Sequence, residues 1–260
     1  MNRLFPRPDP YLSTARSVRI ALQRGTLPGA PKALRGVCAL FISDVHLRPE
    51  VDPRPLRRMI DDAHADLILF GGDFADTREE ALRLFDALMG LSAPLGVFAV
   101  RGNNDSEAFG PPEALARALN QMGCRLLVNE SASILGGALF VGGVDEHRLG
   151  HPDYAQVFPE SAGAKLLLSH YPILPHASEE DMPDWMLSGH THGGQFNFLG
   201  LTPFAIGFER CGGKSRLAPA RVSGAERFGR TNLLVSKGIG TSRIPLRIGV
   251  RPEIHLLTFA

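Results

Sequence analysis

Cysteine is scarce in this chain of 260 residues, which contains only Cys38, Cys124 and Cys211. The number is odd and no two cysteines stand in a CxxC spacing, so the sequence indicates neither a disulfide framework nor a thiolate zinc site. A reducing compartment fits this usage best. We therefore predict a cytoplasmic protein.

Long apolar runs are also absent. Nowhere does the sequence contain the roughly 18 uncharged apolar residues that a membrane-spanning helix needs. Its basic start is broken by prolines and charges and lacks the apolar core of a signal peptide. We predict that residues 1–35 form an N-terminal arm that could contact a membrane surface peripherally. The candidate apolar contacts of this arm are Leu12, Val18, Ile20, Ala21 and Leu22.

The chain has no excess of charge of one sign. It carries 28 basic and 27 acidic residues, a formal net charge of +1. A field this weak gives little attraction to nucleic acid, so no nucleic-acid partner is predicted. Apolar residues make up 44% and charged residues 21%, which is typical of a globular domain. A chain of this length can bury a large core of its own.

Strand and helix patterns alternate from residue 36 to residue 128. Apolar runs predict strands, and apolar residues recurring on one face predict amphipathic helices between them. This order is typical of βαβ units and therefore of parallel strands. The predicted strands are 37–42, 67–70, 97–100 and 125–128, and the predicted helices are 54–65, 78–89 and 112–122.

Beyond residue 128 the pattern changes to short strands separated by turns, which predicts antiparallel hairpins. The last strand is predicted to be an edge or closing strand, and residues 202–228 a long functional or mobile loop. Together the two halves predict an α/β fold in which two facing mixed β-sheets are flanked by helices, as one domain over residues 36–260. The later strands are expected at 133–135, 138–141, 165–169, 185–187, 232–236 and 254–259.

Polar side chains of one chemical kind follow several of these strands. Because ligands in open α/β sheets bind outside the carboxyl ends of the strands, we expect these residues to converge there. They number seven: Asp44, His46, Asp73, Asn103, His170, His190 and His192.

Each of these residues has an ordinary explanation when it is taken alone. An aspartate such as Asp44 or Asp73 after a strand is usually a turn or helix cap, and a buried His170 is usually part of the core. Asn103 is equally typical of a left-handed turn. The segment GHTHGGQ at residues 189–195 is more specific, because two histidines two positions apart in a glycine-flanked turn cannot be core residues of a helix.

The chemistry of the set indicates transition metals. Imidazole, carboxylate and amide ligands together favour manganese, iron, zinc or cobalt over calcium. Seven candidates exceed the ligand shell of one ion, which indicates two ions sharing a carboxylate. Such two-ion sites hydrolyse phosphate esters.

Five ordered motifs strengthen this interpretation: SDVH, FGGDFAD, RGNND, LLSHYP and SGHTHGGQ. The set resembles the calcineurin-like metallophosphoesterase superfamily, whose pattern reads DxH, GDxxD, GNHD, H and GHxH. The segment KGIGTSRIPLRIGVRPEIHLLTF is similar to the bacterial YkuE-like phosphohydrolases. The resemblance extends from about residue 37 to the last residue.

The resemblance implies a metal-dependent phosphoesterase with two divalent ions. Manganese is the expected metal, and iron, zinc, cobalt or nickel are compatible. A metal-bound hydroxide would be the nucleophile, without a phospho-enzyme. One ion would be held by Asp44, His46 and His192, the other by Asn103, His170 and His190, with Asp73 bridging both.

The sequence departs from the pattern at Asn104, where GNHD has a histidine that contacts phosphate and protonates the leaving oxygen. Asparagine donates a hydrogen bond but no proton, which favours phosphodiester or pyrophosphate bonds over alkyl monoesters. Asn104 and Asp76 are nevertheless the two predicted catalytic residues besides the ligands. Asp76 matches the second aspartate of GDxxD and is expected to orient a neighbouring ligand.

Three arginines and one histidine stay open at this stage. Arg243 and Arg247 could meet a substrate phosphate, although loop arginines are more often solvated, and Arg101 is undecided. His147, in the segment GGVDEH, is the histidine to follow. Surface or structural roles are expected for most of His64, His151, His176 and His255.

Two other functions remain open. Relatives of this superfamily include UDP-diacylglucosamine hydrolases of lipid A synthesis, and such an enzyme would work at a membrane surface. Apolar contacts there could come from Phe204, Ile206 and Phe208, for which core packing is the simpler explanation. Other members have become non-catalytic scaffolds, but these tend to lose metal ligands, whereas all seven are present here.

Overall fold

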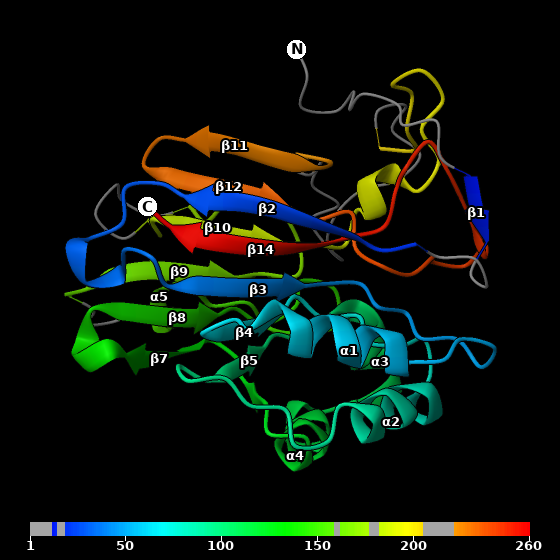
Figure 1. Ribbon diagram of the computed structural model, residues 1–260, viewed down its shortest axis with the longest axis horizontal. Coiled ribbons are helices and arrows are strands. Elements are labelled where there is room, and N and C mark those ends of the chain that lie inside the picture. The colour runs from blue at the N-terminus through cyan, green and yellow to red at the C-terminus, as the bar shows by residue number, and fades with distance from the viewer. Residues whose placement is uncertain (1–11, 15–18, 159–161, 177–181, 205–220) are drawn as a thin grey trace.

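The computed structural model describes residues 12–14, 19–158, 162–176, 182–204 and 221–260. Within them the chain forms two facing six-stranded sheets and one small two-stranded sheet (Figure 1). The predicted α/β sandwich of two mixed sheets is confirmed. The candidates Ile206 and Phe208, and Cys211, lie outside the described residues.

The first large sheet has the strand order β2-β14-β3-β4-β5-β6. Strands β3 to β6 run parallel, as the βαβ pattern predicts. The strands are β2 (Ala21–Leu27), β3 (Cys38–Ile42), β4 (Leu67–Phe70), β5 (Val97–Ala99), β6 (Arg125–Leu126) and β14 (Glu253–Phe259).

Helices cover the outer face of this sheet and leave its inner face for the second sheet. Ile42 and Phe70 face outward into one apolar cluster with the helices, whereas Phe41 and Leu69 face inward. This alternation is the two-residue period of a strand. The helices are α1 (Arg54–Ala63), α2 (Arg78–Ala87), α3 (Asn103–Phe109) and α4 (Pro112–Gln121).

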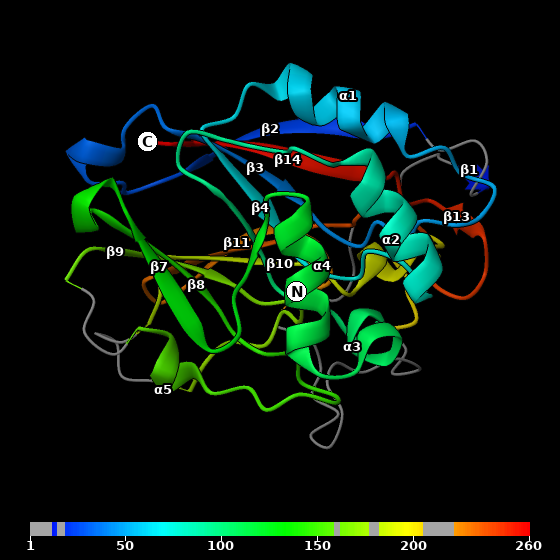
Figure 2. The same cartoon turned by 90° about the horizontal axis from the view of Figure 1, so that it is seen from below.

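The second large sheet has the order β11-β12-β10-β9-β8-β7. Its inner face packs against the first sheet through Trp185, Leu166 and Leu168. On its outer face lies the short helix α5 (Tyr154–Val157), which Figure 2 shows on the side opposite α1. The strands are β7 (Glu130–Ile134), β8 (Leu139–Gly143), β9 (Ala164–Leu168), β10 (Trp185–Ser188), β11 (Gly224–Phe228) and β12 (Thr231–Val235).

The hairpin expected from residues 133–141 is present as the antiparallel pair β7–β8. The centre of the second sheet differs from the expected hairpins, because β8, β9, β10 and β12 run parallel there. Strand β14 is not an edge strand, since it lies between β2 and β3, which leaves the alternative of a closing strand. Residues 21–27, which include the candidate surface contacts Ala21 and Leu22, form β2 within the sheet.

The small sheet pairs β1 (Leu12–Thr14) with β13 (Leu246–Ile248) at one end of the molecule (Figure 1). Among the described residues, no helix is both long enough and apolar enough to cross a membrane.

Candidate metal centre

The predicted ligands gather at one edge of the sandwich because the strands that precede them are parallel. Asp44 and His46 follow β3, Asp73 follows β4, and Asn103 opens α3 after β5. In the second sheet His170 follows β9, and His190 and His192 follow β10. The two sheets thus contribute their carboxyl-end loops to one site.

Two groups of side chains are close enough to hold a cation. The ligand atoms of Asp44, His46 and His192 lie within 4.8 Å of one another, and so do those of Asp44, Asp73 and His170. The Asp73 Oδ2 atom lies 3.3 Å from His46 Nε2 and 3.4 Å from His170 Nε2. Asp73 therefore stands between the two groups, and Asp44 belongs to both.

The remaining two candidates border the second group. The rings of His170 and His190 are 5.1 Å apart, and the His190 main-chain N–H donates to Asp44 Oδ1 over 2.9 Å. Asn103 is buried, and its Oδ1 atom accepts a hydrogen bond from the Tyr171 hydroxyl at 3.2 Å. All seven predicted ligands thus lie at one edge.

The donor set fits a metal for a second reason. His46 Nε2 and His170 Nε2 are buried, and neither makes a hydrogen bond in the described structure. A buried polar atom without a partner destabilises a fold by about 1–3 kcal/mol unless something binds it. Both nitrogens point to the Asp73 carboxylate, so a cation there would satisfy them.

The loops that carry these ligands have unusual backbone conformations. Asp44, His46, Asp73, His190 and His192 all have positive φ, between 39° and 68°. Residues other than glycine avoid this region, and each instance typically costs of order 1–3 kcal/mol. Such strain is typical of functional sites, where the direction of a side chain matters more than a low-energy backbone conformation.

Two glycines make room for the carboxylates. A Cβ atom on Gly102 would lie 2.0 Å from Asp73 Oδ1, and one on Gly189 would lie 2.1 Å from Asp44 Oδ2. Because real carbon atoms do not approach so closely, only glycine allows the loops of the two sheets to close around the acids.

The carboxylates and two imidazoles form a charged cluster. Burial alone would raise the pKa of Asp73, but the positive charges of His170 and His46 outweigh it and hold the pKa well below its ordinary value. Burial would lower the pKa of His46, yet the carboxylates of Asp73 and Asp76 raise it to about 10. Burial would also lower the pKa of His170, but Asp73 raises it to about 9. A bound cation would displace these protons.

The other two histidines favour the neutral form. Burial and the charge of His170 lower the pKa of His190 to about 3. Burial and the charge of His46 likewise lower the pKa of His192 well below its ordinary value. Neutral imidazole is the form that binds metals, so these two side chains need no deprotonation at neutral pH.

The predicted catalytic residues both contact ligands. Asp76 Oδ1 lies 2.6 Å from His46 Nδ1, which directs His46 Nε2 toward the cluster. The Asn104 main-chain N–H and its Nδ2 group donate to Asp73 Oδ1 and Oδ2 at 2.9 and 3.0 Å. Asn104 is therefore anchored on the central carboxylate.

Asp105 has a structural task that the sequence interpretation missed. Its buried carboxylate accepts hydrogen bonds from the main-chain N–H groups of Gly102, Asp73 and Phe74 at 2.7–2.9 Å. It thereby ties the loop after β4 to the loop after β5. The signal was present, since Asp105 is the last residue of RGNND.

Tyr171 was missed as well. Its buried ring lies between His190, at 4.0 Å between centroids, and His147, at 5.3 Å. His147, the histidine singled out from the sequence, forms a hydrogen-bonded pair with Tyr154 at 2.9 Å. The order His190, Tyr171, His147 follows the order of β10, β9 and β8 in the sheet.

The arginines serve the framework. Arg247 is buried, and its guanidinium donates to the main-chain carbonyls of Lys237 and His192, which braces the loop after β10. Arg101 forms a buried ion pair with Asp145, at 2.6 and 2.9 Å. Of the two roles that the sequence left open for Arg247, phosphate contact and solvation, its burial contradicts solvation, whereas Arg243 is exposed.

Phe204 has an ordinary explanation. It is buried in a cluster with Tyr171, Ile173 and Val222, so core packing accounts for it and an interfacial role does not.

Comparison with known proteins identifies this arrangement. The calcineurin-like phosphoesterase model matches residues 39–194. YpbG of Bacillus subtilis is 33% identical over 227 residues, covering 84% of this chain and 79% of that protein. The metallophosphoesterases YkoQ and YkuE of the same organism are 29% and 28% identical, over 83% and 88% of this chain and 80% of each relative.

The fold and these matches define a metal-dependent phosphoesterase. The chain belongs to the calcineurin-like phosphoesterase family.

Proposed function

We propose that the protein hydrolyses a phosphodiester or pyrophosphate bond at a centre of two divalent ions, with manganese the expected metal. The observation that carries this proposal is the pair of ligand groups that meet at Asp44 and Asp73. One ion would be held by Asp44, His46 and His192. The other would be held by Asn103, His170 and His190, and Asp73 would bind both. Two such ions would polarise the phosphoryl group and lower the pKa of the attacking water.

The chain's own residues would orient the site. Asp76 fixes the ring of His46 through its Nδ1 atom, and the Tyr171 hydroxyl fixes the amide of Asn103. Asp105 holds the two loops around Asp73 in register. These contacts supply the positioning on which phosphoryl transfer depends.

Asn104 supports the choice of bond. Its amide donates to Asp73, and asparagine has no proton to give to a leaving oxygen. A bond whose leaving group is already a good one needs that proton least. Diesters and pyrophosphates with stable leaving groups therefore suit this site better than alkyl monoesters.

The first experiment compares hydrolysis of bis(p-nitrophenyl) phosphate and p-nitrophenyl phosphate with added manganese, for the wild type and Asp73→Asn. We expect metal-dependent diesterase activity that falls at least about a hundredfold in the variant, since even residues around metal ligands are worth that much. Asp61→Asn, at an exposed helix position, is the matched control and should leave the rate unchanged. Preference for the monoester would contradict the choice of bond. Absence of both turnover and metal uptake would favour a non-catalytic scaffold.

Asn104→His tests the leaving-group argument separately. A histidine there restores a proton donor, so hydrolysis of an alkyl monoester should rise, by up to about 10²-fold, while the p-nitrophenyl diester rate changes little. Equal changes in both substrates would contradict the argument. Location in the cytoplasm remains a prediction.

A further inference from the structure

Apolar side chains gather on the surface beside the small sheet. Ten large apolar side chains are exposed among the described residues, and five of them belong to three segments that meet there. We name these five the apolar rim: Leu12, Phe198, Leu199, Leu201 and Ile244. The other five, Leu22, Leu82, Met89, Leu135 and Leu149, belong to other segments, and single exposed apolar side chains are normal.

Main-chain contacts join the three segments of the rim. Leu12 of β1 pairs with Ile248 of β13, and Ile248 in turn bridges to Phe196. The Gln195 side chain donates to the Ile244 carbonyl at 2.9 Å. Figures 1 and 2 both place β1 next to the chain around β13. The segments that carry the apolar rim are therefore neighbours, although they come from distant parts of the sequence.

A tight turn forms the tip of the rim. Phe198 and Leu201 bridge one another across Leu199 and Gly200. Leu199 is 92% exposed and has a positive φ of 53°, so the fold holds a large apolar side chain outward in a strained conformation. Burial in the core does not explain this side chain.

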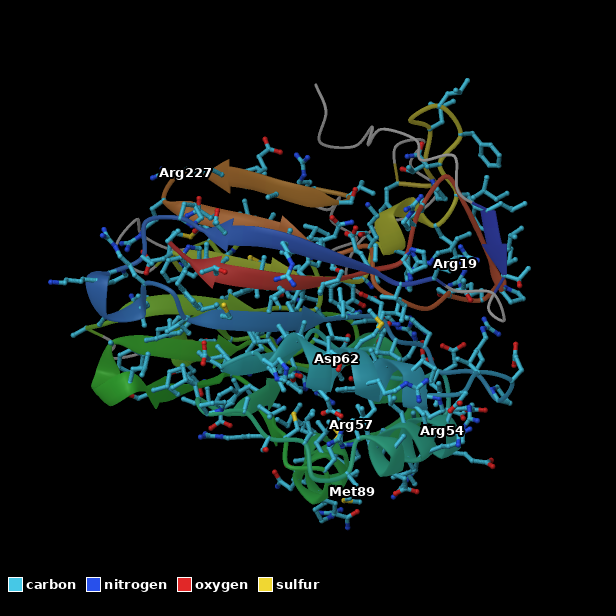
Figure 3. The ribbon with its side chains drawn as sticks, viewed as in Figure 1. Arg19, Arg54, Arg57, Asp62, Met89 and Arg227 are labelled. Atoms are coloured by element: carbon cyan, nitrogen blue, oxygen red, sulfur yellow. The ribbon has the colours of Figure 1, made fainter. Side chains whose placement is uncertain are left out.

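The segments that carry the apolar rim are basic. Their described residues, 12–14, 19–20, 195–204 and 241–251, contain four arginines and no aspartate or glutamate, whereas Glu50 and Asp52 line a pocket beside Ile20 and Thr241. Arg19, Arg243 and Arg251 are exposed, and Figure 3 labels Arg19 on the side of β1. Since the chain as a whole is nearly neutral, this is a local excess of positive charge.

The rim also lies beside the candidate metal centre. Arg247 of β13 donates to the His192 carbonyl, and Gln195 follows His192 by one short turn. Whatever binds the rim would thus stand next to the loop after β10.

We propose that the apolar rim docks the protein on an anionic lipid surface, with Phe198, Leu199 and Leu201 entering the boundary between headgroups and acyl chains and arginines such as Arg243 binding lipid phosphates. Protruding apolar side chains with basic neighbours are typical of such contacts. A lipid surface deforms around a projecting turn, whereas a protein partner would need a matching pocket. This docking does not depend on the proposed hydrolase activity.

The test is flotation of the full chain with phosphatidylcholine vesicles that contain or lack phosphatidylglycerol. We expect the wild type to float with the anionic vesicles and to dissociate as salt is raised. Leu199→Asn should lower the partition coefficient at least about tenfold, because a buried leucine contributes that much or more. Arg243→Gln should lower it about fivefold.

Leu135→Asn is the matched control, since Leu135 is exposed, has a φ of 51° and lies on a different element. Arg227→Gln is the control for Arg243, and Figure 3 labels it at the opposite end of the molecule. Equal losses in Leu199→Asn and Leu135→Asn would overturn the proposal, and so would absence of vesicle binding by the wild type. Self-association that Leu199→Asn abolishes, without vesicle binding, would instead assign the rim to a second copy of the chain.

Discussion

The layer between the two sheets and the loops at their carboxyl ends are both buried, but by different means. Between the sheets, regular strands pack apolar side chains such as Trp185, Phe259 and Phe41 against one another. At the loop edge, aspartates and histidines are buried on a backbone with positive φ. The first region stabilises the fold, and the second uses part of that stability to hold the predicted metal ligands in place.

Trp185→Ala should disrupt the packing between the two sheets and cause the largest loss of stability. Trp185 is almost fully buried at the start of β10, and its Nε1–H donates to the Pro28 carbonyl. Removing it should lower the free energy of unfolding by about 3–5 kcal/mol, measured by urea denaturation. Trp185→Phe should lose less unfolding free energy than Trp185→Ala. The metal stoichiometry of the folded fraction should be unchanged in both variants. Weaker metal uptake with intact stability would contradict the separation of the two regions.

Gly102→Ala should damage the loop edge instead. The added Cβ would meet Asp73 Oδ1 at 2.0 Å and displace the central carboxylate. Metal affinity, measured by calorimetric titration, should fall at least about a hundredfold. Gly25→Ala is the control, because its Cβ would meet only the end of Leu257, at 3.2 Å. Similar metal affinities in the two variants would show that the loop after β5 shifts to accommodate the Cβ atom, which would contradict the expected rigidity of this loop.

Tyr171→Phe sharpens the comparison within the site. It removes only the hydroxyl that donates to Asn103, so the ion expected at Asn103, His170 and His190 should bind about 10–100-fold more weakly. Unfolding stability should change by only about 1 kcal/mol. Tyr154→Phe, which also loses a hydrogen-bonded hydroxyl but contacts His147, should leave both ions unaffected. Loss of both ions in Tyr171→Phe would indicate general disruption.

Glu253→Gln concerns a buried charge away from the predicted ligands, and its effect should appear as a change in the pH dependence of stability. Burial would raise the pKa of Glu253, but His255 and Lys237 outweigh it and lower the pKa from 4.5 to about 2. Because the folded-state pKa is the lower one, the carboxylate stabilises the fold above about pH 4.5, and this contribution is lost as pH falls toward 2. Acid unfolding of Glu253→Gln should depend less on pH in that window, as followed by circular dichroism. An unchanged slope would contradict the lowered pKa.

The first sheet could largely be predicted from the sequence because its strands and helices have clear apolar periods. Strand β2 could not, since its side chains are mostly exposed and its place depends on pairing with the main chain of β14. Helix α3 was hidden because Asn103, Asn104 and Asp105 begin it with residues typical of turns. The parallel centre of the second sheet was hidden because the described parts of its crossovers contain only the short helix α5 and the 3₁₀ turn His192–Gly194.

The candidate site likewise contains features that the sequence predicted and features that it did not. Motif order alone predicted that seven ligands would converge, since strand ends fix where they lie. The tasks of Asp105 and Arg247 depend on which main-chain atoms come within reach, and no spacing in the sequence records that. Phe204 is a related case, because exposure of an aromatic side chain is decided by tertiary packing.

The central place of β14 has a consequence for how the protein is made. Residues 255–258 pair with residues 38–41, and residues 253–259 pair with residues 21–27. During synthesis one edge of β3 therefore stays unpaired until residues 253–259 have left the ribosome. Emergence of β14, rather than formation of the early helices, then sets the moment at which the first sheet can close.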